Sequence, residues 1–334
     1  MQANQSIPMV HMSAVSAPMD MLDAMGVPLQ PGLAATNMPT RIVDEREGYV
    51  PFRAACTWLH RAGHDQGIDN FGLRSALNAG PAMLADSLRD TLVAAPTLYK
   101  GICKWADLIH RESSHAAIWV DDSGKDLRLR FSSTFAQDVP GQSDWIWFAC
   151  ALHMTVARLF LGPDWTPAEI TVPMHGGGLD VAQELLPDTR LRRDPKLTGL
   201  TIPRELLSAA PLAVAGATAS GGALPTPPDT LESSLAELVR LYLPDGVPRI
   251  EAAAEAAGMS VRTLQRRLAG QSLSYDQLVS KLRFEQACRL LQHPELNIND
   301  IARQLGYRHA THFTRAFRRI AGISPRDYRR YSRH

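Results

Sequence analysis

The stretch that decides the fold of this chain is 258–268, GMSVRTLQRRL, a turn followed by a short basic helix. Gly258 can take the left-handed backbone conformation of a sharp turn, and Ser260 can accept a hydrogen bond from the free N–H groups that open a helix. At 100° per residue the apolar residues share one side of this helix and the polar residues share the other. The apolar side is Val261, Leu264 and Leu268, and the polar side is Arg262, Gln265 and Arg266.

The residues just before this stretch complete a supersecondary motif. Residues 250–257, IEAAAEAA, form a small-residue helix whose alanines let a partner helix approach closely. A helix, a glycine-centred turn and a helix with a polar outer face make a helix-turn-helix. Arginine and glutamine bind guanine and adenine edges in the major groove of DNA. A solvated basic surface helix is the alternative interpretation. The predicted DNA-binding residues of this first copy are Ser260, Arg262, Thr263, Gln265 and Arg266.

The same pattern recurs in 300–319, DIARQLGYRHATHFTRAFRR, where Gly306 stands 48 positions after Gly258. The turn of this second copy has one extra residue. Its second helix is expected to bury Phe313, Ala316, Phe317 and Ile320. The predicted DNA-binding residues of this copy are His309, Ala310, Thr311, Thr314, Arg315 and Arg318. Two such units in about 100 residues indicate a duplicated motif.

A helix is predicted between the two copies, over 274–294, with Ser274 and Gln277 as a capping box and Pro294 as its end. Its apolar residues fall on two opposite faces, so we expect it to be packed between the two motifs. One face has Tyr275, Leu278, Val279, Leu282 and Leu290, and the other has Phe284, Ala287, Cys288 and Leu291. About 18 residues at 1.5 Å each make a rod of roughly 27 Å, close to the 34 Å of one DNA turn.

These segments resemble the DNA-binding module of the AraC/XylS family of bacterial transcription regulators. The resemblance rests on MSVRTLQRRL (259–268), LRFEQACRLL (282–291), G-Y-x5-F-x-R-x-F (306–317) and G-x-S-P-x-x-Y-R (322–329). It implies an all-α C-terminal domain of two helix-turn-helix motifs bridged by a linker helix, which binds double-stranded promoter or operator DNA and works with RNA polymerase.

The sequence departs from the family pattern at 308–311. Arg-His-Ala-Thr stands here where the family favours a serine, an acidic residue, a glutamine and a serine. This change weakens the helix cap, so we expect the first motif to be the stronger reader of bases.

The overall charge of +1 hides an asymmetry between the two parts of the chain. Residues 231–334 contain 17 Lys and Arg against 10 Asp and Glu, a net charge of +7, whereas residues 1–230 have a net charge of −6. The basic part fits a partner with a phosphate backbone. Four widely spaced cysteines without a C-x-x-C pair argue against a zinc finger or a disulfide framework and fit a reducing cytoplasm. We expect a cytoplasmic protein without a membrane span.

The remainder of the chain predicts an α+β sensor domain. An uncharged Ala/Gly/Pro-rich run predicts a linker, so the expected domains are 1–212, 213–229 (linker) and 230–334. The first part is expected to be a loose tail over 1–40 with a short helix near 19–25, then a helix over 49–63 and two helices over 80–110 that are broken at Pro96. A hairpin over 115–133 and a helix over 144–162 should follow. The last expected elements are strands over 169–173 and 197–203, with a helix over 178–186 between them.

Three segments of this domain resemble the arabinose-binding-like N-terminal domain of some AraC/XylS members: FGLRSALNAG (71–80), TLVAAPTLYKG (91–101) and IPRELLSAAPL (202–212). The resemblance implies a domain that senses a small-molecule effector. All six tryptophans lie in this domain, either as ordinary core or as the walls of an effector pocket. The predicted effector-binding residues are Trp119, Trp145 and His153.

The sequence therefore predicts an effector-responsive transcription regulator, in particular an activator and a homodimer. No catalytic residues, metal ligands or cofactors are predicted. Two alternatives stay open: an enzyme of the DNA-repair type fused to such a module, and an architectural DNA binder that senses nothing. The enzyme would need clustered zinc-binding cysteines and a Pro-Cys-His nucleophile, and neither motif occurs in the sequence.

Overall fold

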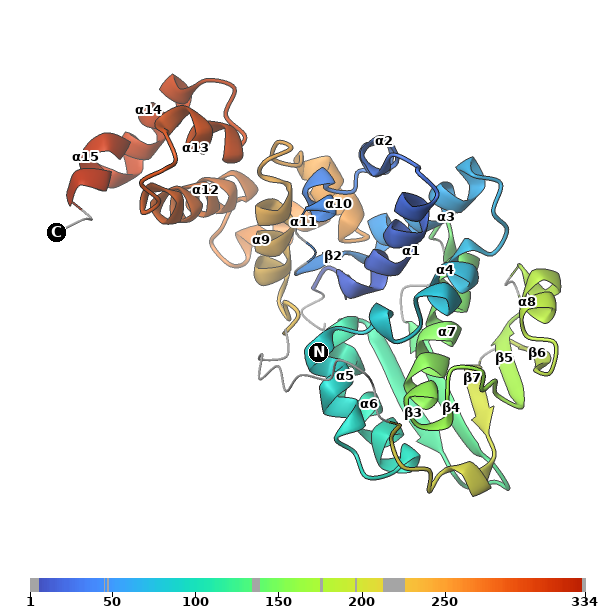
Figure 1. Cartoon of the computed structure of the whole chain (residues 1–334). Coiled ribbons are helices and arrows are strands. Elements are labelled where there is room, and N and C mark those ends of the chain that lie inside the picture. Colours follow the sequence, from blue (N-terminus) through green and yellow to red (C-terminus); the bar gives the residue numbers. More distant parts are fainter. Residues whose placement is uncertain are drawn as a thin grey trace. The chain divides into compact units, whose positions relative to one another are not determined.

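The computed structural model describes residues 6–44, 46, 48–133, 139–174, 177–195, 197–212 and 226–331 (Figure 1). The chain divides into two units. The N-terminal unit comprises Pro8–Met38 and Arg46–Pro227. The C-terminal unit comprises Pro228–His334 together with two short segments from the start of the chain, Met1–Ile7 and Pro39–Glu45.

A five-stranded sheet organises the N-terminal unit, with strand order β3-β4-β7-β5-β6. Its strands are β3 (Ala116–Asp121), β4 (Leu127–Ser133), β5 (Glu169–Pro173), β6 (Arg190–Asp194) and β7 (Thr198–Ile202). All neighbours are antiparallel except β5 and β6. The hairpin predicted over 115–133 is confirmed as β3 and β4, in a register that places Ile118 opposite Phe131.

An apolar helix, α7, lies against the sheet, and several helices of this unit pack on it (Figure 1). The helices are α1 (Ser13–Ala24), α2 (Leu29–Ala35), α3 (Phe52–Asp65), α4 (Phe71–Ala79), α5 (Asp86–Val93), α6 (Leu98–Glu112), α7 (Gln142–Leu161) and α8 (Leu179–Leu185), with short 3-10 turns η2 (Gly80–Met83) and η3 (Arg204–Leu206). α7 contacts α3, α4, α6 and β7. It is long and apolar enough to cross a membrane, but 67% of its most apolar window is buried inside the fold. The α+β fold class predicted for this part of the chain is confirmed.

The prediction of a loose tail over residues 1–40 is wrong for the part that the structure describes. β1 (Met9–His11) pairs with β2 (Tyr49–Pro51) in a separate two-stranded sheet, and α1 begins at Ser13 rather than near residue 19. The Met- and Ala-rich composition concealed a helix face that is buried against the rest of the unit. The sequence also gave no sign of β6, because RLRRD is a charged edge strand that pairs only with β5.

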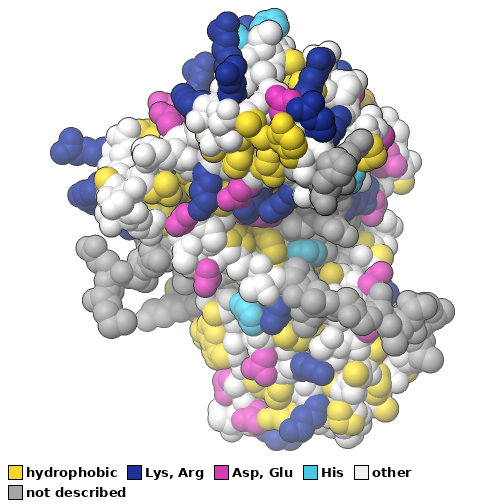
Figure 2. Space-filling view, turned by 90° about the vertical axis from the view of Figure 1, so that its left-hand side faces the viewer, with side chains coloured by type: hydrophobic (Ala, Val, Ile, Leu, Met, Phe, Trp, Pro, Cys, Tyr) yellow, Lys and Arg dark blue, Asp and Glu magenta, His cyan; other side chains and the backbone are white. Residues whose placement is uncertain are grey.

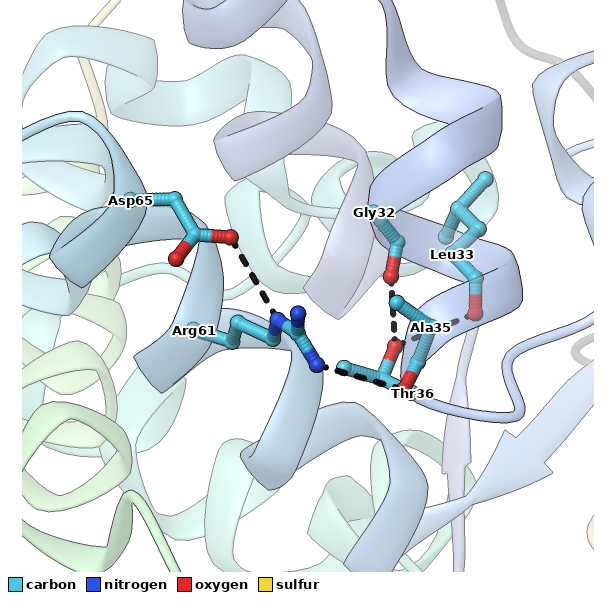
Figure 3. A network of polar contacts seen from close by, with 6 residues as sticks. All are labelled: Gly32, Leu33, Ala35, Thr36, Arg61 and Asp65. Carbon is cyan, nitrogen blue, oxygen red and sulfur yellow. Dashed lines mark hydrogen bonds and ion pairs between the residues drawn. The ribbon is translucent and has the colours of Figure 1, made fainter.

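A small polar network joins the end of α2 to α3 (Figure 3). The Thr36 hydroxyl donates to the carbonyls of Gly32 and Leu33, at 2.9 and 3.1 Å, and so satisfies groups in the last turn of α2. Arg61 on α3 lies 3.4 Å from Asp65 Oδ2 and 3.5 Å from the Ala35 carbonyl. Both charged side chains are about half exposed, so this ion pair contributes little stability.

The C-terminal unit has the predicted double helix-turn-helix. Its helices are α9 (Leu231–Tyr242), α10 (Ile250–Ala256), α11 (Val261–Ala269), α12 (Tyr275–Leu291), α13 (Ile298–Gln304), α14 (Ala310–Ala321) and α15 (Pro325–Tyr331). α10 and α11 form the first motif, and α13 and α14 form the second. The capping box of α12 is confirmed: Gln277 N–H donates to Ser274 Oγ at 3.2 Å, and Ser274 N–H donates to Gln277 Oε1 at 2.8 Å.

α12 packs mainly between α9 and the second motif, whereas we expected it to lie between the two motifs. It contacts α9 on one side and α13, α14 and α15 on the other. Arg283 of α12 fastens the second motif, because its guanidinium donates to the Leu305 and Gly306 carbonyls at 3.0 and 3.3 Å. It also lies over the Tyr307 ring, 4.3 Å from the ring centre. The prediction that Ile320 is buried is wrong: this side chain, near the free end of α14, is 46% exposed.

Two segments from the start of the chain pack in the C-terminal unit, and we call them the straps. The first strap is Ser6 and Ile7, where the fully buried Ile7 donates its N–H to the buried Ser234 hydroxyl of α9 at 2.9 Å. The second strap includes the 3-10 turn η1 (Thr40–Val43). Thr40 donates through its N–H (2.7 Å) and its hydroxyl (2.6 Å) to the Asp245 carboxylate, just after α9. The domain boundaries 1–212, 213–229 and 230–334 stay predictions, since residues 213–225 lie outside the described residues.

The turn glycines of the two motifs provide a matched pair for measuring stability. Gly258 and Gly306 both have positive φ, +63° and +71°. A Cβ on Gly258 would meet open space, whereas a Cβ on Gly306 would lie 2.6 Å from the Leu243 carbonyl oxygen. We expect Gly258→Ala to destabilise its motif by about 1–2 kcal/mol, from backbone strain alone. Gly306→Ala should lower the stability of its motif by about 1–3 kcal/mol more than that, because the added methyl group is overpacked against the Leu243 carbonyl.

Hydrogen exchange of the backbone amides of α10 to α14 in the full chain measures the loss of stability in each motif separately. Equal loss of protection in the two variants would show that the contact between Gly306 and Leu243 does not crowd the second motif.

Candidate nucleic-acid interface and ligand pocket

The first candidate reading helix is α11, which the sequence singled out. Ser260 caps it: the hydroxyl oxygen accepts from the Thr263 N–H at 3.2 Å and lies 2.9 Å from the Thr263 hydroxyl. Leu264 and Leu268 are fully buried and hold the helix on its unit. The side chains predicted to read bases are exposed on the outer face: Arg262, Gln265 and Arg266.

The second candidate reading helix is α14, and it is held differently. Phe313 and Phe317 are buried beneath it, with ring centres 5.8 Å apart. His309 stands at the N-cap position, but its side chain makes no capping hydrogen bond, so the cap is weak as predicted. On the outer face Thr311, Arg315 and Arg318 are exposed, and Ala310 and Thr314 are partly buried.

The arginines on these outer faces are not used inside the fold. Among the residues that the structure describes, no hydrogen bond or ion pair holds the side chains of Arg262, Arg266, Arg315 and Arg318. Elsewhere in the same unit, by contrast, Arg303 lies 2.5 Å from Asp300. A guanidinium without an internal carboxylate partner can bind a base edge or a phosphate without first breaking an ion pair.

A hollow of about 750 Å³ lies along the outer face of α14. Its walls are Asn297, Ile298, Asn299, Ala310, Thr311, Thr314, Arg315, Ser324, Pro325, Arg326 and Arg329. Arg329 donates from Nε to the Leu291 carbonyl at 3.2 Å, while its buried Nη2 has no hydrogen-bond partner within the described residues. Sequence reasoning missed Asn297, Asn299, Arg326 and Arg329, although the G-x-S-P-x-x-Y-R motif contains the two arginines. The space-filling view shows Lys and Arg side chains projecting from the surface, with hydrophobic side chains exposed among them (Figure 2).

The N-terminal unit contains a cavity of about 610 Å³. Residues from α3, α6, α7 and the β3–β4 hairpin line it, among them Phe52, Phe131, Trp145, Phe148 and Leu152. Of the three predicted effector-binding residues, Trp145 and His153 line this cavity. Trp119 does not: it is 41% exposed, on the face of β3 opposite to Ile118. Side chains alternate along a strand, so the neighbouring Ile118 faces the cavity instead.

His153 is a buried polar group in the cavity wall. The Trp105 indole N–H donates to His153 Nδ1 at 3.0 Å. The Phe131 ring meets the His153 ring edge to face, with 4.1 Å between the ring centres. Burial lowers the pKa of His153 to about 3, so the ring is neutral. Because Nδ1 accepts from the indole, which can only donate, the ring proton resides on Nε2, and His153 is a hydrogen-bond donor at that atom.

Glu112, at the end of α6, is the acidic group of the wall. It is 3% exposed, and its Oε2 accepts from the Ser13 hydroxyl of α1 at 2.6 Å. Burial raises the pKa of Glu112 to about 7, and the bond from Ser13 opposes part of that rise. Sequence reasoning missed Glu112, although the signal was present: at helical spacing it shares the face of Ile102, Trp105 and Ile109.

Two family models match the chain in separate regions. Residues 26–210 match the arabinose-binding domain of AraC transcription regulator, N-term, and residues 253–331 match a helix-turn-helix domain. The regulator VirS of Mycobacterium tuberculosis is 41% identical over 102 residues, 30% of this chain and 30% of VirS. The regulator VqsM of Pseudomonas aeruginosa is 30% identical over 177 residues, 51% of this chain and 54% of VqsM.

The solved structure of the regulator CdpR from Pseudomonas aeruginosa is 22% identical and aligns over 91% of this chain and 96% of CdpR, with a TM-score of 0.37. The alignments with VirS and VqsM span about a third and about half of those relatives. The match to the N-terminal family model covers more than half of this chain, and the second match covers both reading helices. The chain therefore belongs to the AraC family of transcription regulators.

Proposed function

We propose that this chain regulates transcription by binding specific DNA through α11 and α14, under the control of a small molecule bound in the N-terminal unit. The observation that carries the proposal is the aromatic-walled cavity of about 610 Å³ in the same chain as a double helix-turn-helix. Its volume lies within the roughly 300–1,000 Å³ of small-molecule sites. An architectural DNA binder would need no such cavity, and this favours the sensing function over that alternative.

The geometry of the C-terminal unit supports reading of two neighbouring groove segments. α12 has 17 residues, which at 1.5 Å each make a rod of roughly 26 Å. Since the major groove repeats about every 34 Å, a rod of this length can hold two reading helices near successive turns on one face of the DNA. We assign base reading mainly to α11, because its cap is intact and its outer face carries Arg262, Gln265 and Arg266.

The first strap supplies a route of covalent and hydrogen bonds from the cavity to the DNA-binding unit. The Ser113–Ser114 segment follows Glu112 on the cavity wall, and Ser114 exchanges hydrogen bonds with Met9 of β1, at 2.9 Å in each direction. The chain runs back from Met9 through Pro8 to Ile7, which is bonded to Ser234 of α9. A ligand that shifts the cavity wall can thus act on α9 without a separate signalling element.

We further propose that the protein activates transcription together with RNA polymerase, as a homodimer in the cytoplasm. Fusion of a target promoter to a reporter tests the sign of regulation. Sedimentation of the full chain at micromolar concentration tests the dimer, and a purely monomeric species would remove that part of the proposal. The regulator assignment leaves no role for catalysis, and we propose that the chain is not an enzyme.

The two reading helices should differ in what their loss does to specificity. On the preferred site, selected from random DNA with the full chain, Arg266→Ala should weaken binding by about 1–3 kcal/mol, because a bidentate contact to a base edge is lost. Thr314→Ala should weaken it by less than about 1 kcal/mol, because a single hydroxyl discriminates poorly between bases. Competition against a scrambled site measures both effects. If Arg266→Ala weakens both DNAs equally while Thr314→Ala loses only the selected site, the readers are assigned in reverse.

Arg315 and Arg318 should act on the DNA backbone. Each of Arg315→Ala and Arg318→Ala should lower the affinity for selected and for random DNA alike. Each should also reduce the slope of log affinity against log salt concentration by about one. Titrations of the full chain between low and physiological salt measure the slope. Arg303→Ala is the control, because this arginine is paired with Asp300 and should leave the slope nearly unchanged. A wild-type affinity that does not depend on salt would contradict the assignment.

A thermal-shift screen of the full chain against metabolites should find a ligand, which raises the melting temperature by mass action. That ligand should also change the affinity for the selected DNA. Asp245→Ala removes both bonds from Thr40 and should keep the thermal shift but lose most of the change in DNA affinity. Asp276→Ala, the same charge change at an exposed site on α12, should keep both. If Asp245→Ala responds like the wild type, the second strap transmits no signal.

A further inference from the structure

Among the described residues that line the cavity of the N-terminal unit there are one acid and no permanently charged base. Glu112 contributes the carboxyl group, and none of the described residues of the wall is a lysine or an arginine. The two histidines of the wall are His115 and His153, and burial lowers their pKa values to about 4 and 3. The wall is therefore neutral or negative near neutral pH.

This charge pattern disfavours an anionic ligand. A carboxylate or phosphate that leaves water for an apolar site needs a cation or several strong donors to replace its hydration. The neutral His153 offers one N–H donor at Nε2, and Glu112, which lines the same cavity, would repel an anion whenever it is ionised.

Within the described part of the chain, Glu112 has no counter-ion. The residue on α1 that binds it is Ser13, a neutral hydroxyl, and behind Ser13 stands His11, whose Nδ1 lies 2.9 Å from Ser13 Oγ. Burial lowers the pKa of His11 to about 4, so this ring is neutral too. An ammonium group brought by a ligand would supply the missing positive charge and favour the ionised form of Glu112.

Aromatic rings form the adjoining part of the wall. Phe52 and Trp145 meet edge to face with their centres 5.1 Å apart, and Trp145 and Phe148 lie 5.3 Å apart. The faces of such rings attract cations as well as apolar groups. One side of the cavity thus suits the apolar body of a ligand, and the side at Glu112 suits a positive charge.

We propose that the cavity binds an organic amine, with its apolar body against Phe52, Trp145 and Phe148 and its ammonium group on the Glu112 carboxylate. His153 Nε2 then donates to an acceptor on the body of the ligand, if the ligand carries one. This assignment rests on the proposed function, since it names the chemical class of the effector.

Isothermal titration of the full chain with three probes of one skeleton tests the class: 4-phenylbutylamine, 4-phenylbutanol and 4-phenylbutyrate. The amine should bind at least about tenfold more tightly than the carboxylate. Glu112→Gln, which keeps the size of the side chain, should weaken the amine at least about tenfold and change the affinity of the alcohol less than about threefold. Glu184→Gln, an exposed acid on α8, is the control and should change neither.

Three results would overturn the amine: tighter binding of the carboxylate, equal binding of the amine by wild type and Glu112→Gln, or no binding of any probe. DNA affinity measured on the same samples separates this inference from the proposed function. Glu112-dependent amine binding that leaves DNA affinity unchanged supports the ligand class and counts against effector control. Carboxylate binding that shifts DNA affinity supports effector control and overturns the amine.

Discussion

The packing of α12 between α9 and the second helix-turn-helix is the constraint on which the DNA-binding unit depends. A seven-residue helix such as α10 or α13 has too little apolar surface to fold alone, because most helical stability in proteins comes from tertiary packing. α12 provides a packing surface for the α13–α14 pair, and Arg283 adds hydrogen bonds to the turn carbonyls of that pair. The side chains on the outer faces of α11 and α14 are therefore not needed for packing inside the unit. These faces can carry arginines that have no ion-pair partner inside the described fold.

The N-terminal unit meets the opposite physical problem, since it must bury polar groups. α7 has a nearly continuous apolar surface, yet it places His153 at the cavity, where a Trp105 indole fixes the tautomer of the ring. Glu112 is held by a single hydroxyl. Buried groups of this kind are unfavourable for stability unless they are paired, so their position in the wall of a cavity points to a ligand as the missing partner.

The straps make the two units interdependent through the covalent chain. Two pairs of residues that lie 227 and 205 positions apart in sequence, Ile7 with Ser234 and Thr40 with Asp245, are joined by hydrogen bonds of 2.6 to 2.9 Å. The chain therefore leaves the C-terminal unit after Ile7, returns to it at Pro39, leaves it again after Glu45 and enters it finally at Pro228. These passages are the basis of the proposed coupling between the ligand and the DNA-binding unit.

The sequence by itself determined the double helix-turn-helix, the family and the exposure of Arg262, Gln265 and Arg266, because these follow from local signals: glycine turns, caps and helical periodicity. It also placed Trp145 and His153 at a pocket. Only the tertiary structure decided that Trp119 faces away, that Ile320 is exposed and that Glu112 enters the cavity wall. It alone decided, too, that Ile7 bonds to α9 and Thr40 to Asp245 just after α9. Each of these depends on which distant element covers a given face, and periodicity in one segment carries no information about its partner.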